Sequence, residues 1–195
     1  AEGRCAFILN ADTHIRPSAV DQLESYLFSL DKAVIAGPQG AIIDFQNLRD
    51  ARYYEKGTFN EPEQVHAVAG FFFAIHLERY LKHHLLFDVQ FSPCFYEEWD
   101  IGLQVMQAGL ACYTVPVKDF EHHWGASQDE KLSVTYFGRK MSREDILPKN
   151  REKFIAKWDN AIYNEESGKL NHLKIQRFND FLEKVKRETY PEPVA

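Results

Sequence analysis

The first residues that could do chemistry are Asn10-Ala11-Asp12, which directly follow the apolar run Cys5–Leu9. The run predicts a short buried strand, and α/β sheets bind their ligands beyond the carboxyl ends of strands. One carboxylate and one amide oxygen suit a hard divalent cation that also carries substrate phosphates, because Mg²⁺ usually takes only one or two protein carboxylates. The alternative is a plain turn, since Asn and Asp commonly end strands.

A second group, Glu97-Glu98-Trp99-Asp100, places three carboxylates within four residues at the expected start of a helix. Crowding and partial burial would raise the pKa of one carboxyl and suit it to act as a general base. A low-dielectric wall would come from the neighbours Cys94, Phe95, Tyr96 and Trp99. The alternative is that the acids only balance the helix dipole.

A third group, Glu121-His122-His123-Trp124, follows an expected strand. Imidazole is a common metal ligand and anion partner. Adjacent side chains point in different directions, so one of the two histidines could serve, and the sequence does not decide which. The alternative is an ordinary hydrogen-bonded loop histidine. The HExxH pattern of zinc proteases does not occur.

A fourth feature is Gly70, at the centre of a strand expected over residues 65–75. Without a Cβ atom, the backbone there would let a sugar or a phosphate approach closely. The alternative is that this glycine only relieves crowding in the sheet.

The elements that must position these groups alternate between short apolar strands and amphipathic helices, which indicates an α/β domain. Strands are expected over residues 5–9, 33–36, 65–75 and 111–117, and helices from Pro17 and over residues 98–108. Residues 44–64 read as a long surface excursion. After Ser142 and Asp145, which have near capping-box spacing, two further helices are expected, the last over residues 170–185.

Composition excludes several classes of protein. The 195 residues are 45% hydrophobic and carry a net charge of −6, which argues against disorder and against a general nucleic-acid binder. Three separate cysteines with no CxxC pair exclude a structural zinc finger. No apolar run reaches the roughly 18 residues of a membrane helix. The first residue is Ala1 and both methionines are internal, so we expect a piece of something longer.

Together and in this order, the groups resemble the latter half of a family 2 glycosyltransferase, of the rhamnosyltransferase-like group. The similarity covers about residues 3–160. Leu77 stands where that family often has Arg, and Glu98 replaces its usual second acid. The residues that carry the resemblance are Asn10-Ala11-Asp12, Gly70 to Glu78, Phe87-Asp88, Glu97 to Ile101, Ala108-Gly109, His122 to Ser127, and Asn150 with Phe154, Lys157 and Trp158.

The resemblance implies a GT-A fold, a mixed α/β sheet flanked by helices, over residues 1–140, with a C-terminal helical extension over residues 141–195. It also implies that the N-terminal nucleotide-binding half is absent, and that another chain supplies it or the sequence is a fragment. The implied reaction is transfer of a sugar from a nucleotide-sugar donor to a glycan or other hydroxyl acceptor, by a single inverting displacement, as in polysaccharide biosynthesis. The implied location is cytoplasmic or peripheral to a membrane.

The resemblance assigns roles residue by residue. Asp12 and His122 would hold Mg²⁺ or Mn²⁺, and Glu98 would be the catalytic base with Glu97 and Asp100 in support. Substrate contacts would come from Asn10, Gly70, Trp99 and Trp124.

Two other readings stay open. The chain could be a non-catalytic GT-A-like module that binds glycan or protein, with Tyr53, Tyr54, Phe59 and Trp124 as a sugar platform. An α/β phosphotransferase ranks last, because no glycine-rich phosphate loop is present.

Overall fold

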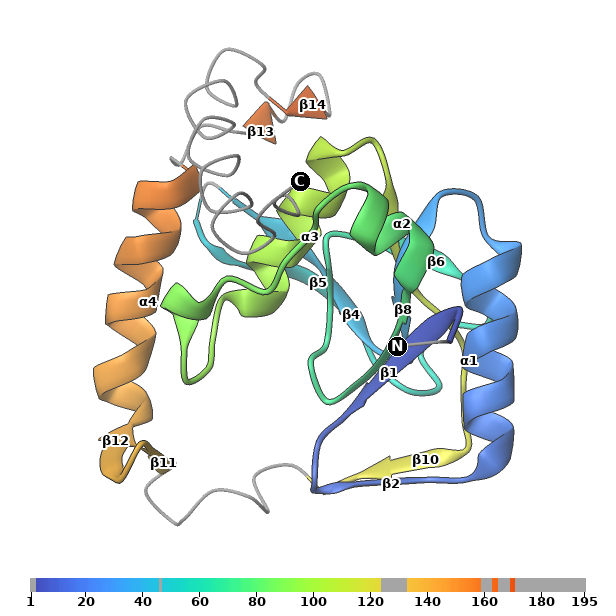
Figure 1. The fold of residues 1–195 in the computed structure, drawn as a ribbon, viewed down its shortest axis with the longest axis horizontal. Helices are drawn as coiled ribbons and strands as arrows, with labels where there is room; N and C mark the ends of the chain where they lie inside the picture. Colours follow the sequence, from blue (N-terminus) through green and yellow to red (C-terminus); the bar gives the residue numbers. More distant parts are fainter. Residues whose placement is uncertain (1–2, 46, 124–132, 159–162, 165–168, 171–195) are drawn as a thin grey trace, which may run out of the picture.

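A computed structural model describes residues 3–45, 47–123, 133–158, 163–164 and 169–170. In these ranges the chain forms a mixed α/β structure in which helices cover both faces of a central sheet (Figure 1). None of the helices there combines the length and the apolar character needed to span a bilayer.

The central sheet has five strands in the order β1-β8-β3-β9-β6. All neighbouring pairs are antiparallel except β3 and β9, which run parallel. The fully buried strands β3 and β8 lie inside the sheet, and β1 lies at one edge. The strand bounds are β1 Cys5–Leu9, β3 Ala33–Gly37, β6 Glu63–Val65, β8 Phe72–His76 and β9 Ala111–Thr114.

A second sheet has three strands in the order β5-β4-β7, with bounds β4 Gly40–Asp44, β5 Arg49–Tyr54 and β7 Ala67–Val68. The described residues form three further strand pairs: β2 (Thr13–Ile15) with β10 (Phe120–His122), β11 (Ser133–Tyr136) with β12 (Arg139–Ser142), and β13 (Tyr163–Asn164) with β14 (Lys169–Leu170).

The helices are α1 (Pro17–Ser29), α2 (Leu77–Lys82), α3 (Glu97–Gln107) and α4 (Arg143–Trp158), with a short 3-10 turn, η1, at Val89–Phe91. Helix α1 begins with a proline, as expected, and buries Ala19, Leu23 and Leu27 against β3 and β8. Helix α3 packs against β7 and β9. The α4 start has the expected capping box, in which Ser142 Oγ accepts from Asp145 N at 3.2 Å and Asp145 Oδ2 accepts from Ser142 N at 3.4 Å.

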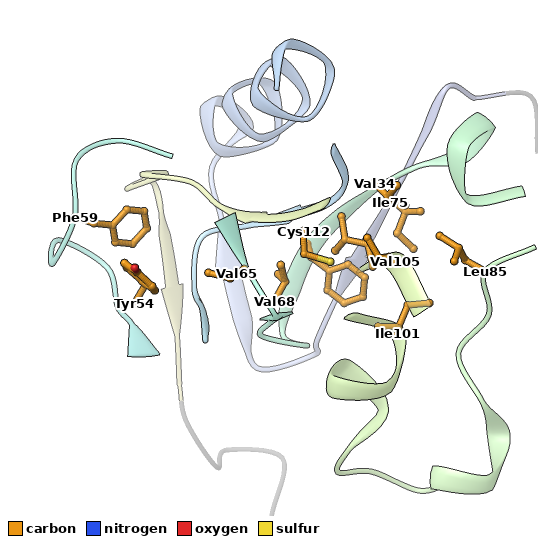
Figure 2. Packing of buried hydrophobic residues seen from close by; sticks show 12 residues of the cluster. Val34, Tyr54, Phe59, Val65, Val68, Ile75, Leu85, Ile101, Val105 and Cys112 are labelled. Carbon is orange, nitrogen blue, oxygen red and sulfur yellow. The ribbon is translucent and has the colours of Figure 1, made fainter. Parts of the chain in front are cut away.

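The core between the sheet and α3 is closely packed. Figure 2 shows Val34, Ile75 and Cys112 of the sheet near Ile101 and Val105 of α3, and all five belong to one buried cluster. Gly102 makes this approach possible, because a Cβ there would overlap the carbonyl oxygen of His66. The position of α3, and of the acids at its start, is therefore fixed by backbone packing.

Three sequence predictions were wrong in detail. Residues 65–75 do not form one strand: β7 pairs with β4 and β8 pairs with β1 and β3, so the chain changes sheets at a turn that contains Gly70. The excursion over residues 44–64 contains β5, which pairs along the whole of β4. Lys169 and Leu170 form a strand and not the start of a helix, and the rest of that predicted helix lies outside the described residues.

Candidate active site

One cavity of about 520 Å³ collects side chains from segments far apart in the sequence. Its walls come from the turn after β1, from β4 and β5, from the turn between β7 and β8, and from the start of α3. The side chains that matter for chemistry are Asn10, Asp12, Asp50, Tyr53, Glu97, Glu98, Trp99 and His122.

Asp12 and His122 meet because β2 pairs with β10, in a register that sets Thr13 opposite His122. Asp12 Oδ1 lies 3.4 Å from His122 Nε2, and both side chains are nearly inaccessible to solvent. The His122 ring stacks on Phe71, with ring centroids 4.1 Å apart. Burial lowers the pKa of His122, although Asp12 acts against this. A lowered pKa favours the neutral imidazole that can ligate a metal.

The turn before β2 also has the plain structural role that the sequence allowed. The Thr13 backbone N–H donates to the Asn10 carbonyl at 3.1 Å, and the Asn10 N–H donates to the Phe71 carbonyl at 2.8 Å. These bonds hold Asn10 and Asp12 at the cavity wall. The two interpretations of Asn10-Ala11-Asp12, a plain turn and a candidate ligand site, are therefore compatible.

Glu97 and Glu98 begin α3 and face the same cavity. Burial raises the pKa of Glu97 to about 8, and the Glu98 charge adds to the rise. Burial also raises the pKa of Glu98, while backbone N–H groups, including that of Gly70, act against the rise. A Cβ at Gly70 would overlap Glu98 Oε1. The absence of a side chain at residue 70 therefore leaves room for the Glu98 carboxylate. Two crowded carboxyl groups with raised pKa values fit acid–base work.

The backbone just before α3 is unusual. Phe95 and Tyr96 both have φ of 75°, the left-handed region that non-glycine residues rarely adopt. Asn150 of α4 stabilises this turn, because its Nδ2 donates to the carbonyls of Phe91 at 2.6 Å, Cys94 at 2.8 Å and Phe95 at 3.3 Å. The costly conformation is thus held in place by surrounding contacts.

Asp100 has a different position from its helix neighbours. It does not line the cavity, and its side chain is fully buried on another side of α3. Its carboxylate accepts from Lys157 Nζ at 2.7 Å, Trp158 Nε1 at 2.6 Å and Gln104 Nε2 at 2.7 Å. Lys157 also pairs with Asp88 at 2.6 Å. The contacts of Asp100 thus tie α3 to α4.

No protein-family model matches this sequence, and no curated protein matches it. Among solved structures, that of GalNAc-T7 with UDP, GalNAc and Mn²⁺ is similar, with a TM-score of 0.56 and 17% sequence identity over 98% of this chain. The chain spans 42% of the length of that protein's chain. This chain has a GT-A glycosyltransferase fold. The likeness concerns the fold, so membership of family 2 stays a prediction.

Within this GT-A fold, the structure brings together most of the residues predicted from the sequence. The predicted site residues at the cavity are Asn10, Asp12, Gly70, Glu97, Glu98, Trp99 and His122. The choice between the two histidines also narrows: His122 lines the cavity, whereas His123 is exposed. Trp124 lies outside the described residues.

Two cavity residues of the GT-A domain, Asp50 and Tyr53, were not among the predicted catalytic or metal residues. Tyr53 was expected only as part of a sugar platform. Both lie on β5, where a register shift leaves Ala51 without a partner, because Arg52 faces Ile42 and Asp50 faces Ile43. Such a bulge re-aims side chains. No sequence pattern indicates this bulge, because β5 lacks an alternating apolar pattern.

Proposed function

We propose that this chain carries the reacting centre of a glycosyltransferase that moves a sugar from a nucleotide-sugar donor to a hydroxyl acceptor. One observation carries the proposal: Asp12 and His122 face the same cavity as Glu97 and Glu98, in a GT-A fold. A polar pair suited to a cation and diphosphate thus shares one cavity with a carboxylate pair suited to proton transfer.

Glu98 is the proposed base. Its carboxylate removes the proton of the acceptor hydroxyl while that oxygen forms a bond to the anomeric carbon and the bond from this carbon to the donor phosphate breaks. The product glycoside then has the opposite anomeric configuration, and the nucleoside diphosphate leaves. Glu97, whose pKa is near 8, holds a proton at neutral pH and spares Glu98 a second neighbouring negative charge. Asn10 and Trp99 line the cavity and would contact the substrate.

The donor set at Asp12 and His122 fits a divalent cation. A carboxylate oxygen and an imidazole nitrogen 3.4 Å apart are near enough to share one ion. In the described part of the chain, no group of three or more His, Cys, Asp or Glu is arranged to hold a metal, so the remaining ligands would be diphosphate oxygens and water. When bound, Mg²⁺ or Mn²⁺ would offset the negative charge that develops on the leaving diphosphate.

The direct test is release of nucleoside diphosphate from UDP- and GDP-sugars by the full chain, with Mn²⁺, Mg²⁺ or EDTA. We expect turnover that needs the cation and that falls by a factor of about 10² or more in Asp12→Asn. Glu121→Gln is the matched control, because Glu121 is exposed beside His122 on β10. The anomeric configuration of the product, read by NMR, tests inversion directly; retention would overturn the single displacement.

The alternative is a GT-A-like module that binds a glycan or a protein without catalysis. The observation that favours it is the pair of rings, Tyr53 and Trp99, which line the cavity and could stack on a sugar. Calorimetry separates the two proposals. Sugar binding by the wild-type chain, with no turnover of any donor and no change in Glu98→Gln, would support the alternative.

A further inference from the structure

The bulge in β5 has a consequence for which molecule the cavity accepts. In a regular strand, residues 50 and 53 would lie on opposite faces, because side chains alternate. The unpaired Ala51 shifts this alternation, so that Asp50 and Tyr53 both line the cavity. Arg52 lies over the Tyr54 ring instead, with its guanidinium carbon 4.3 Å from the ring centroid. The bulge thus places the exposed Asp50 and the half-buried Tyr53 at the wall of the cavity, and Arg52 away from it.

The cavity is strongly acidic as a result. Its lining residues include the carboxyl groups of Asp12, Asp50, Glu97 and Glu98, and no Lys or Arg of the described ranges is among them. The charges also act on each other, since the Asp50 charge helps to raise the pKa of Glu98.

The arginines close to these walls are engaged outside the cavity. Arg49 pairs with Asp44 at 3.2 Å, and Arg143 lies 5.5 Å from the Phe95 ring centroid. A bound cation at Asp12 and His122 would offset charge at the donor end. The acceptor end would keep the negative charges of Asp50 and Glu98, while Glu97 holds a proton near neutral pH.

We propose that β5 forms the acceptor wall, where Asp50 and Tyr53 select an uncharged sugar and exclude sugar acids and sugar phosphates. This rests on the proposed glycosyl transfer. Carboxylates accept hydrogen bonds from sugar hydroxyls, and Trp99 and Tyr53 supply rings beside them. The Tyr53 hydroxyl donates to Gln39 Oε1 at 3.2 Å, which holds its ring in position. Rejection of an anion follows from like-charge repulsion in a partly enclosed site.

The test compares p-nitrophenyl β-glucoside with p-nitrophenyl β-glucuronide, two probes that differ mainly in one carboxylate. Binding to the full chain is measured by ligand-observed NMR, which needs no turnover. We expect the glucoside to bind at least about tenfold more tightly than the glucuronide. In Asp50→Asn the preference shrinks severalfold, and in Asp50→Lys it is lost or reversed.

Arg52→Gln is the matched control. It changes one charge on the same strand but away from the cavity, so the preference should stay as in the wild type. Equal binding of the two probes, binding of neither, or an unchanged preference in Asp50→Lys would each overturn the proposal. Donor turnover is measured separately, so failure of acceptor selection leaves the proposed reaction standing, and failure of turnover leaves the charge preference testable.

Discussion

Asp100 and Glu97 lie one turn apart on α3, and their surroundings differ in kind. Burial raises the pKa of both carboxyls. Around Asp100, however, Lys157 and Trp158 act against the rise and contribute short hydrogen bonds. Around Glu97, the neighbouring Glu98 adds to the rise, and Oε2 of Glu97 is buried with no hydrogen-bond partner among the described residues.

This difference in surroundings suggests different roles within one helix: Asp100 stabilises the fold, whereas Glu97 is suited to proton transfer. A buried carboxylate that has a cation and donors holds two helices together, and removing one partner leaves an uncompensated charge. A buried carboxylate without such partners destabilises the fold, yet it is suited to hold or take a proton. The comparison therefore predicts that changes on the two sides of α3 will have opposite effects on stability and activity.

The largest effect is expected for Glu98→Gln. Loss of the base should lower the turnover number by roughly 10² to 10⁴, the usual contribution of general base catalysis. The free energy of unfolding should stay the same or rise, because a crowded acid is removed. Steady-state kinetics and urea unfolding of the same samples check both parts. Retained turnover would remove Glu98 from the mechanism.

Lys157→Met should have the largest effect on stability. Asp88 and Asp100 would be left buried without their cation, which costs about 3–5 kcal/mol of unfolding free energy. The triple variant Lys157→Met, Asp88→Asn, Asp100→Asn should recover part of this loss, because it removes the stranded charges. Urea unfolding measures both. A loss below about 1 kcal/mol for the single variant would mean that the network is not what holds α3 to α4.

Stability should depend on pH through Glu97. Its pKa is about 8 in the folded chain against an ordinary value of 4.5, so the folded state holds the proton more tightly than the unfolded state. This contribution is fully present below about pH 4.5 and is lost as the pH rises to about 8. The wild type minus Glu97→Gln difference in unfolding free energy should therefore fall across this window, by up to a few kcal/mol. A flat difference would contradict the raised pKa.

A smaller effect is expected for Asn150→Ala, which removes the donors to the carbonyls of Phe91, Cys94 and Phe95. Leaving these carbonyls without Asn150 should cost about 1–3 kcal/mol. The left-handed turn before Glu97 should also loosen, so the KM for the acceptor should rise more than the turnover number falls. Asn150→Asp is the partner variant: it keeps the size but loses the donors, and it should lose stability in the same way. An unchanged KM in both would limit Asn150 to a structural role.

The sequence predicted the order of elements well where apolar periodicity was strong, as at α1, β3 and α3. Seven of the predicted site residues line the cavity, and the polar ones among them were visible because such groups at the ends of strands and helices form short patterns. It could not show that Asp100 turns away from Glu97 and Glu98, since that depends on Lys157, 57 residues further along the chain. The bulge at Ala51 was hidden for the same reason, because only the pairing with β4 reveals it.

The contacts of α4 also bear on how the molecule is assembled. Asn150, Lys157 and Trp158 reach back over 55 to 69 residues to the segment from Asp88 to Asp100, which contains the acidic pair Glu97 and Glu98. Closing such a long loop costs entropy before any contact forms, so this docking is expected late in folding. The strands of the sheet can pair first, and Glu97 and Glu98 reach their final positions only when the end of α4 packs against the segment before α3. A chain shortened at the predicted boundary after residue 140 would thus keep the strands of its five-stranded and three-stranded sheets, but Glu97 and Glu98 would lack the contacts that position them.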